Sequence, residues 1–455
     1  MALFERNRSN RIREGSSTES YSQINPYIDE LVEHYKARLL KETNLEALTS
    51  LSQGEMRLRI EQLVSQFMSE EKVIISRQDK EFLLTRIIDE SVGYGPLEPL
   101  LNDPDITEIL INGHKEVYIE KTGKLQLTGI TFRDERHVRH VIDRIVAPLG
   151  RRIDESSPMV DARLPDGSRV NAVIPPISLN GTLISIRKFR KEPFKMKDLL
   201  GFDSLEAKMA AFLQAIVKAK MSILISGGTG SGKTTLLNVL GSEIPAAERV
   251  ITIEDSAELR LDRPNVVGME ARPANVEGSG EISIRQLVKN ALRMRPDRII
   301  VGEVRGSEAF DMLQAMNTGH EGSLTTVHAN TPADALRRIE GMVVMAGMDL
   351  PTHIVREYIV GAIDFIVQGE RLTDGTRKIT SISEVFTSED GKIVVNEIFK
   401  FQRIEMDEDG TVKGQFVPTG IIPNCLERLR VFGQEIDPSI FQSKGVKTIG
   451  SSYTL

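Results

Sequence analysis

A glycine-rich segment at residues 227–234 has the residue types and spacing that can hold a phosphate chain. It reads Gly-Gly-Thr-Gly-Ser-Gly-Lys-Thr, which fits the pattern G-x-x-x-x-G-K-[ST]. A strand is predicted at 223–226, directly before it, and a helix is predicted to begin at Lys233. Glycines let backbone N–H groups converge on a phosphate, and the helix N-terminus adds the positive end of its dipole. The segment therefore predicts a nucleotide-binding P-loop rather than an ordinary glycine-rich turn.

The residues of this P-loop have distinct expected roles. Lys233 is expected to bridge the β- and γ-phosphates of a nucleotide. The Thr234 hydroxyl is suited to Mg²⁺, which prefers oxygen ligands and keeps most of its waters. The predicted nucleotide-contacting residues are Gly227, Gly228, Thr229, Gly230, Ser231, Gly232, Lys233, Thr234 and Thr235.

Acidic residues end two further predicted strands and could complete a hydrolytic site. Residues 298–303 read Arg-Ile-Ile-Val-Gly-Glu, and Glu303 is expected to hold magnesium through water. Residues 249–255 form a second apolar run that ends in an acidic pair, where Glu254 could act as general base with Asp255 in support. The alternative is that these carboxylates only cap the helices that follow the strands.

Two histidines lie around a short strand predicted at 324–327. The stretch 319–328 reads Gly-His-Glu-Gly-Ser-Leu-Thr-Thr-Val-His. His328 ends the strand, where its side chain could reach the γ-phosphate or relay the presence of the nucleotide to a neighbour. A surface histidine or a satisfied core histidine is the alternative. A zinc site has little support, because no cysteine lies nearby.

Composition limits the classes to which the chain can belong. Its 455 residues suggest about three folded units, and 40% hydrophobic with 27% charged residues is ordinary for a globular protein. A net charge of -7 gives no global basic field, so nucleic acid is not an expected partner. The single cysteine, Cys425, fits a reducing cytoplasm. No signal sequence and no membrane-spanning stretch are expected, so membrane contact is predicted to be through a partner rather than by insertion.

Periodicity and composition divide the chain into five segments. Residues 1–23, with four arginines and few apolar side chains, are expected to be a disordered tail. Apolar residues at helical spacing predict a small helical bundle at 24–93, and short β-rich runs among helices predict an α+β domain at 94–190. A charged linker with a proline is expected at 191–201. Strands that alternate with helical stretches predict an α/β domain with a largely parallel sheet at 202–455.

Four motifs, taken together and in order, resemble the secretion ATPase superfamily of type II and type IV secretion. Residues 227–234, 253–255, 291–305 and 319–328 resemble its Walker-A, Asp, Walker-B and His boxes. The resemblance implies that the α/β domain is a RecA-like P-loop NTPase core. It also implies that the nucleotide is ATP, bound with Mg²⁺.

The segment before this core resembles one branch of the superfamily. Residues 93–100 (Gly-Tyr-Gly-Pro-Leu-Glu-Pro-Leu) and 105–113 (Asp-Ile-Thr-Glu-Ile-Leu-Ile-Asn-Gly) are similar to the N-terminal domain of CpaF-type proteins, which serve tight-adherence (Tad) pili. The resemblance covers about residue 24 to the C-terminus. It implies a homohexameric motor at the cytoplasmic face of the inner membrane that works with pilus platform proteins in pilin extraction or retraction. The four boxes do not separate pilus, secretion-system and archaellum branches.

In this superfamily, arginines from the N-terminal domain reach the nucleotide. Residues 161–171 and 186–189 resemble the segment that carries them. The candidates in this chain are Arg163, Arg169 and Arg187. An arginine fork stays charged and can pair two phosphate oxygens at once. Local salt bridges to Asp161 or Asp166 are the alternative.

Two other functions compete with a protein-translocating motor. Nucleic-acid motors share the P-loop core, but 5% aromatic residues and no tryptophan leave few stacking platforms for single strands. A nucleotide-controlled switch would need negligible turnover, and Glu254 and Glu303 argue against that. An ATP-hydrolysing motor for Tad-type pilus assembly, as the resemblance implies, is therefore the favoured interpretation, with a type IV secretion traffic ATPase as its nearest alternative.

Overall fold

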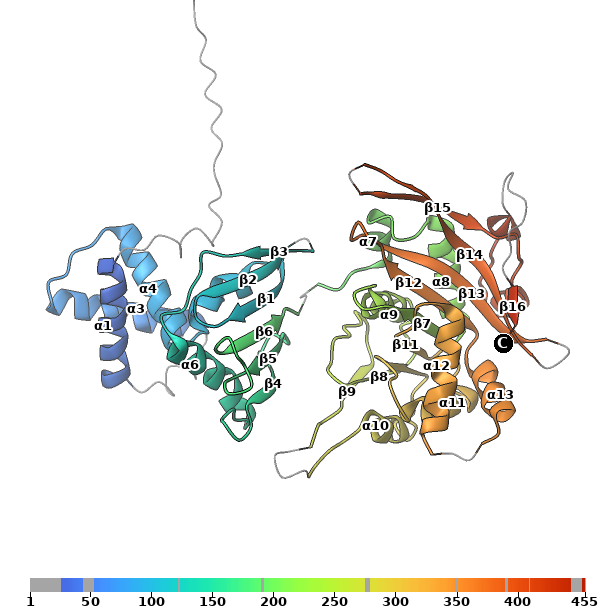
Figure 1. Cartoon of the computed structure of the whole chain (residues 1–455), viewed down its shortest axis with the longest axis horizontal. Coiled ribbons are helices and arrows are strands. Elements are labelled where there is room, and N and C mark those ends of the chain that lie inside the picture. Colours follow the sequence, from blue (N-terminus) through green and yellow to red (C-terminus); the bar gives the residue numbers. More distant parts are fainter. Residues whose placement is uncertain are drawn as a thin grey trace, which may run out of the picture. The chain divides into compact units, whose positions relative to one another are not determined.

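The chain divides into two compact units, Met1–Arg190 and Lys191–Leu455, which Figure 1 shows in the computed structural model. The structure describes residues 26–43, 53–121, 123–189, 192–274, 279–347, 350–388, 392–408, 410–442 and 452–454. The tail predicted at 1–23 lies outside these residues. Each unit is described by itself below.

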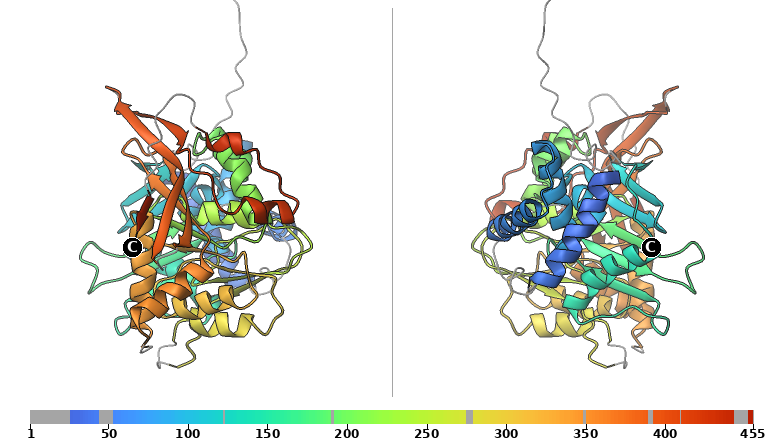
Figure 2. Two further views of the ribbon diagram at one scale, coloured as in Figure 1. Left: turned by 90° about the vertical axis from the view of Figure 1, so that its right-hand side faces the viewer. Right: turned by 90° about the vertical axis from the view of Figure 1, so that its left-hand side faces the viewer.

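Three helices lie in the described part of the first unit before its sheet, and they are α1 (Pro26–Glu42), α3 (Gln53–Glu70) and α4 (Arg77–Ser91). They face the viewer on the right of Figure 2. Apolar residues at helical spacing make each helix bury one face against the other two. The buried residues of their shared core include Ile28, Val32, Tyr35, Ile60, Val64, Phe67, Leu83 and Ile87. The side chain of Ser76 caps α4 by accepting a hydrogen bond from the Asp79 backbone N–H at 3.0 Å.

A six-stranded antiparallel sheet follows the helices in the first unit. Its order is β3-β2-β1-β6-β5-β4. The strands are β1 (Ile106–Asn112), β2 (Glu116–Lys121), β3 (Lys124–Leu127), β4 (Met159–Arg163), β5 (Arg169–Val173) and β6 (Leu183–Arg187). Short helices η1 (Gly95–Leu97) and α5 (Glu98–Asn102) lead into the sheet, and α6 (Glu135–Val146) with η2 (Ala147–Leu149) follows β3. The apolar face of α6 shares one core with β1 and β6.

The second unit is built around a sheet of ten described strands. Its order is β15-β14-β13-β12-β7-β11-β10-β8-β9, and β16 pairs with β14. The parallel part holds β7 (Ile223–Gly227), β8 (Val250–Glu254), β9 (Val266–Glu270), β10 (Arg298–Val301), β11 (Leu324–Val327) and β12 (Phe365–Arg371). The antiparallel part adds β13 (Arg377–Thr387), β14 (Ile393–Met406), β15 (Val412–Pro418) and β16 (Ser452–Thr454). The expectation of a largely parallel sheet therefore holds for β7 to β12 and was incomplete beyond them, because a tight hairpin replaces the crossover helix after β12.

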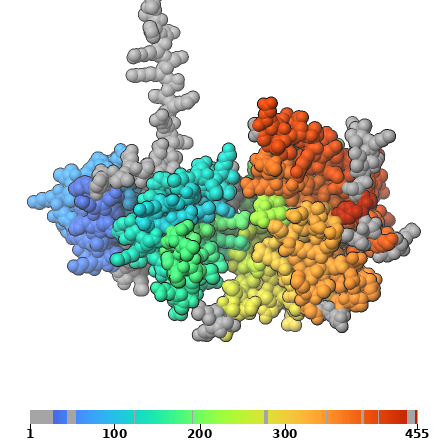
Figure 3. Space-filling view, in the orientation of Figure 1, coloured from blue at the N-terminus to red at the C-terminus, as the bar shows by residue number. Residues whose placement is uncertain are grey.

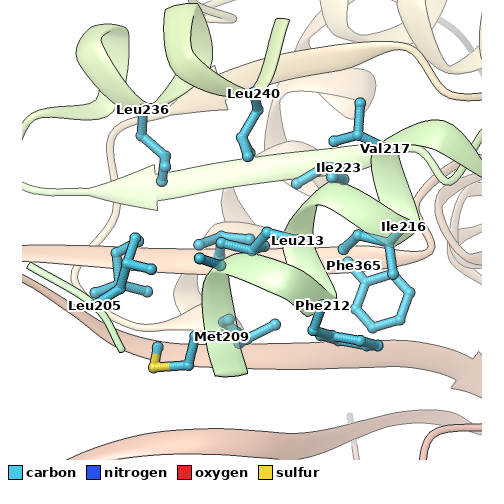
Figure 4. Packing of buried hydrophobic residues seen from close by; sticks show 14 of the residues in the cluster. Leu205, Met209, Phe212, Leu213, Ile216, Val217, Ile223, Leu236, Leu240 and Phe365 are labelled. Atoms are coloured by element: carbon cyan, nitrogen blue, oxygen red, sulfur yellow. The ribbon is translucent and has the colours of Figure 1, made fainter. Parts of the chain in front are cut away.

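Helices cover both faces of this sheet. They are α7 (Met196–Gly201), α8 (Ala207–Lys218), α9 (Lys233–Ser242), α10 (Ile284–Ala291), α11 (Glu308–Asn317), α12 (Pro332–Met345), α13 (Thr352–Ala362), α14 (Leu426–Val431) and η3 (Pro438–Phe441). Figure 4 shows Phe212 and Leu213 of α8 in one hydrophobic core with Phe365 of β12. A second core lies between the sheet and α10 to α13, and α12 and α13 form the orange surface of Figure 3.

These layers confirm the predicted fold class. The sheet places β7, the strand that leads into the P-loop, between β11 and β12. All five residues of β7 are buried. The strand and its loop are therefore held by neighbours on both sides.

Candidate nucleotide-binding and hydrolysis site

The P-loop turns from β7 into α9 at a place where glycine is required. Gly230 and Gly232 have φ angles of +72° and +92°, in the left-handed region that favours glycine. A Cβ on Gly227 would lie 2.3 Å from Ser231 Oγ and 2.5 Å from the Gly369 carbonyl oxygen. The glycines of the sequence motif therefore lie where the backbone conformation and the close contacts of the loop favour glycine.

Polar side chains of the P-loop are fixed within the loop. The Lys233 ammonium donates a hydrogen bond to the Gly228 carbonyl at 3.0 Å, and Ser231 Oγ donates to the same oxygen at 2.9 Å. Burial lowers the pKa of Lys233, while the nearby carboxylate of Glu303 acts in the opposite direction. Thr234 is half-buried in the first turn of α9. A backbone turn, an ammonium and a hydroxyl at a helix N-terminus fit a magnesium-bound nucleotide.

The ends of neighbouring parallel strands meet beside this loop. Strands β8, β10, β11 and β7 are adjacent and parallel, so their carboxyl ends share one edge of the sheet. The Gly302 N–H donates to the Ile253 carbonyl at 2.8 Å, and Thr326 Oγ1 donates to the Gly302 carbonyl at 2.7 Å. This edge brings Glu254 and Glu303 into one neighbourhood with the P-loop.

Glu303 makes an ion pair that sequence reasoning did not anticipate. Arg305 Nη2 lies 2.7 Å from Glu303 Oε2, and its Nη1 lies 3.7 Å from Asp255 Oδ2. The hydrogen bond to Glu303 raises the pKa of Arg305. Arg305 lies in the segment 291–305 that resembles the Walker-B box. The resemblance therefore indicated that Arg305 is near the site, but it did not indicate the ion pair with Glu303. Arg305 links two carboxylates that lie just after β8 and β10.

Glu254 holds the chain that follows β8. Its side chain is buried and accepts hydrogen bonds from the backbone N–H groups of Glu258 at 2.7 Å and Leu259 at 3.1 Å. A Cβ on Gly302 would lie 2.9 Å from Glu254 Cγ, so the glycine before Glu303 makes room for this carboxylate. Glu254 therefore anchors the chain after its strand, as the capping alternative expected, but its donors lie in an irregular segment rather than in a helix.

The two histidines have different surroundings. Burial lowers the pKa of His328, and the positive charges of Lys233 and Arg338 lower it further. Arg338 also donates a hydrogen bond to the His328 carbonyl at 2.8 Å. His320 Nδ1 lies 3.2 Å from the Ala315 carbonyl at the end of α11, which is a local contact. Only His328 therefore lies in the electrostatic neighbourhood of the P-loop lysine.

The three candidate arginines of the first unit form a row across its sheet. Arg163 of β4 is directly opposite Arg169 of β5, and Arg169 is directly opposite Arg187 of β6. Directly opposed residues of antiparallel strands project from the same face, and like charges at such positions repel each other. Asp161 and Asp166, the alternative partners, accept hydrogen bonds from Asn171 and from Ser168. The row belongs to a different unit from the P-loop.

Comparison with known proteins identifies the class. The chain matches the family model for type II/IV secretion system proteins over residues 90–392, more than half of its 455 residues. It belongs to this family, and it is a secretion ATPase by family and fold. Membership indicates nucleotide binding and ATPase activity.

Two relatives are named as proteins of type IV secretion and conjugal transfer. The type IV secretion system protein VirB11 of Brucella suis is 34% identical over 319 residues, covering 64% of this chain and 88% of the relative. The conjugal transfer protein TrbB of Rhizobium radiobacter is 34% identical over 299 residues, covering 65% and 88%. The crystal structure of the Brucella suis VirB11 ATPase with sulphate is 30% identical and covers 63% of this chain and 94% of that chain, with a TM-score of 0.35. Among the described residues, no helix is long and apolar enough to cross a membrane.

Proposed function

We propose that this chain is an ATP-hydrolysing motor that works as a hexameric ring and powers assembly of a Tad-type pilus. The observation that carries the enzymatic part is the shared sheet edge, where the P-loop, Glu254, Glu303 and His328 come from adjacent strand ends. The pilus part is supported by the resemblance of residues 93–100 and 105–113 to the CpaF-type branch. The motor would act in the cytoplasm, at the inner face of the membrane, through contact with pilus platform proteins.

The proposed chemistry assigns each P-loop group to a part of the phosphate chain. Backbone N–H groups of residues 228–234 bind the β-phosphate, and the Lys233 ammonium leaves the Gly228 carbonyl to bridge the β- and γ-phosphates. Thr234 and, through water, Glu303 hold Mg²⁺, which when bound neutralises charge on the phosphates. His328, whose pKa is lowered, is neutral at pH 7 and can accept or donate a hydrogen bond near the γ-phosphate.

Glu254 is the proposed general base, with Asp255 in support. A base must come within hydrogen-bond reach of the attacking water, and catalytic contacts often tighten only when substrate is bound. Glu254 Oε2 accepts backbone hydrogen bonds from Glu258 at 2.7 Å and Leu259 at 3.1 Å, and its Oε1 lies 3.3 Å from the Leu259 nitrogen. The same backbone contacts fix the carboxylate in one orientation.

The arginine row is proposed to complete the site. Three guanidinium groups on neighbouring strands concentrate positive charge that suits a triphosphate. Arginines that stabilise charge in the transition state contribute about a thousandfold or more to phosphoryl transfer. Either the same subunit or a neighbour in the ring could present Arg163, Arg169 and Arg187. Mixing Arg169→Ala with Lys233→Ala separates these geometries, because two inactive proteins regain activity only if each site is shared between chains.

A second candidate function is a traffic ATPase of a type IV secretion system. The similarity to VirB11 and to the conjugal transfer protein TrbB favours it. A nucleic-acid-translocating motor is less favoured, because the net charge of -7 gives no overall attraction to a phosphate backbone.

A cell experiment separates the two candidates. The gene is deleted and then complemented with the wild-type chain or with Glu303→Gln, and surface pili are counted alongside conjugation or secretion. The pilus proposal expects pili to disappear in the deletion and in the Glu303→Gln strain and to return with the wild-type chain. Normal piliation combined with lost conjugation or secretion would favour the traffic ATPase instead.

A further inference from the structure

Two arginines of the β12–β13 hairpin lie against the P-loop, and no motif in the sequence marks them. Arg377 Nε donates a hydrogen bond to the Gly230 carbonyl at 2.9 Å. Arg371 lies on the other strand of the hairpin, and its Nη1 is 3.6 Å from the position that a Cβ on Gly230 would occupy. Both guanidinium groups therefore approach the tip of the loop that is proposed to wrap the phosphates.

The hairpin brings the positive charges of these two arginines together. Arg371 and Arg377 are directly opposite each other in the β12–β13 register, and like charges at directly opposed positions destabilise a strand pair. Both residues are exposed. In the described part of the chain, neither has an aspartate or glutamate oxygen within 4.0 Å. The neighbouring Glu370 is paired with Arg403 at 2.5 Å instead.

The backbone of the β12–β13 hairpin is fixed by contacts with residues 203 and 204 and by hydrogen bonds within its turn. Lys378 is buried, and its ammonium donates to the Asp203 carbonyl at 2.6 Å and to its carboxylate at 2.8 Å. The Ile379 N–H donates to the Ser204 carbonyl at 2.9 Å. The turn itself is fixed by Asp374 Oδ1, which accepts a hydrogen bond from the Thr376 N–H at 2.8 Å. A pre-positioned cation binds an anion with less loss of conformational entropy.

We infer that Arg371 binds the phosphate chain of the nucleotide held by its own P-loop, and that Arg377 positions that loop through the Gly230 carbonyl. The inference deepens the proposed function, because it rests on nucleotide binding at the P-loop. It adds a cation from the same unit to Lys233, separate from the arginine row of the first unit. Arg371 is a binding residue for the phosphates, whereas Arg377 acts on them through the loop.

The test measures nucleotide affinity by calorimetry on the full-length protein with Mg-ADP, and steady-state hydrolysis of Mg-ATP. Arg371→Ala should weaken Mg-ADP binding about tenfold, which corresponds to about 1.4 kcal/mol. The KM for ATP should rise by a similar factor, and kcat should stay within about twofold. Arg371→Lys should lie between Arg371→Ala and the wild type, because lysine keeps the charge but loses the fork. Arg430→Ala, which removes an exposed arginine from α14, is the matched control and should change neither quantity.

Inorganic pyrophosphate identifies the part of the nucleotide that Arg371 contacts. If Arg371 recognises phosphate, Arg371→Ala should weaken competition by pyrophosphate as much as it weakens Mg-ADP binding. Weaker Mg-ADP binding with unchanged competition by pyrophosphate would assign the contact to the base or ribose and overturn the inference.

Arg377 needs a separate readout because it does not touch the phosphates. Arg377→Ala should lower kcat as well as raise KM, since a loosened loop misplaces the reacting phosphate. The Tm measured without nucleotide should stay within about 2 °C of the wild type, while the Tm increase caused by Mg-ADP should shrink. An unchanged increase would reject the positioning role.

The outcomes distinguish this inference from the proposed function. A wild-type protein that binds neither Mg-ADP nor Mg-ATP would remove the proposed function and the inference together. Normal binding by the wild type, with Arg371→Ala indistinguishable from Arg430→Ala, would reject the inference alone.

Discussion

Replacing Glu90 by glutamine tests how the helical bundle of the first unit is fixed to the sheet that follows it. Glu90 lies in the last turn of α4 and is 5% exposed. Its Oε2 lies 3.0 Å from Lys36 Nζ of α1 and 3.1 Å from His137 Nε2 of α6. Arg144 of α6 donates to the Glu90 carbonyl at 3.0 Å. One buried carboxylate thus joins two helices of the bundle to the helix that covers the sheet.

The expected loss of folding free energy can be derived from the pKa of the Glu90 carboxylate. Burial by itself raises the pKa of Glu90, but the hydrogen bond and charge of His137, together with Lys36, outweigh it and lower the pKa to about 2. A fall from 4.5 to about 2 corresponds to about 3 kcal/mol of folding free energy, at about 1.4 kcal/mol per pKa unit. Because the folded-state pKa is depressed, this stabilisation is fully present above pH 4.5 and is lost as the pH falls toward 2.

The assay is urea unfolding followed by far-UV circular dichroism, with hydrogen exchange to locate the change. At pH 7.5, Glu90→Gln should lower the free energy of unfolding of the first unit by about 3 kcal/mol. Faster exchange should appear in α1, α4 and α6, and the difference from the wild type should shrink below pH 4.5. Glu81→Gln on the same helix removes an exposed pair with Arg57 and should change nothing measurable. Equal stability of Glu90→Gln and Glu81→Gln, or a difference that grows in acid, would refute the reasoning.

Three further substitutions test the second unit. Gly302→Ala puts a Cβ 2.9 Å from Glu254 Cγ and should displace this carboxylate. The kcat should therefore fall by roughly 10- to 100-fold while Mg-ATP binding is retained, and an unchanged kcat would argue against Glu254 as the general base. Glu248 Oε2 lies 2.7 Å from Arg298 Nε, and Arg298→Met removes this partner. Urea unfolding should show a free energy of unfolding that is lower by about 3–5 kcal/mol, and an unchanged value would mean that solvent replaces the pair. Burial and the P-loop lysine hold the pKa of His328 below its ordinary value of 6.5, so its protonation should slow the wild type only in acid, and a rate–pH profile of His328→Gln should lack that decline.

The local parts of the site could be predicted from the sequence because they depend on neighbouring residues. Apolar runs that end at glycine or at a carboxylate indicate strands that lead into loops, and β7, β8 and β10 lie where these runs occur. The positive φ angles of the P-loop favour glycine, so the glycine pattern of the sequence predicts the conformation of the loop. The order of the strands in the sheet is not local, but parallel α/β folds place strand ends along one edge, which made the grouping of Glu254, Glu303 and His328 predictable.

Tertiary contacts explain what sequence reasoning missed. Arg377 and Gly230 are 147 residues apart, and nothing in the run around Arg377 distinguishes a P-loop contact from a surface charge. The orientation of Glu254 toward the Leu259 N–H depends on the path of the irregular segment after β8, which the sequence of the strand does not reveal. The antiparallel half of the sheet was missed because β13 buries polar residues such as Glu384, which accepts hydrogen bonds from backbone N–H groups near Cys425, so its apolar alternation is interrupted.

The most direct test of the central claim is phosphate release from Mg-ATP by the purified wild-type chain and by Lys233→Ala. Lys208→Ala, which removes an exposed lysine from α8, is the control for loss of one positive charge. Circular dichroism verifies that all three proteins are folded. We expect magnesium-dependent phosphate release by the wild type and by Lys208→Ala, and loss of almost all turnover in Lys233→Ala with an unchanged spectrum. Wild-type turnover in a well-folded Lys233→Ala protein would contradict the assignment of the P-loop as the hydrolytic site.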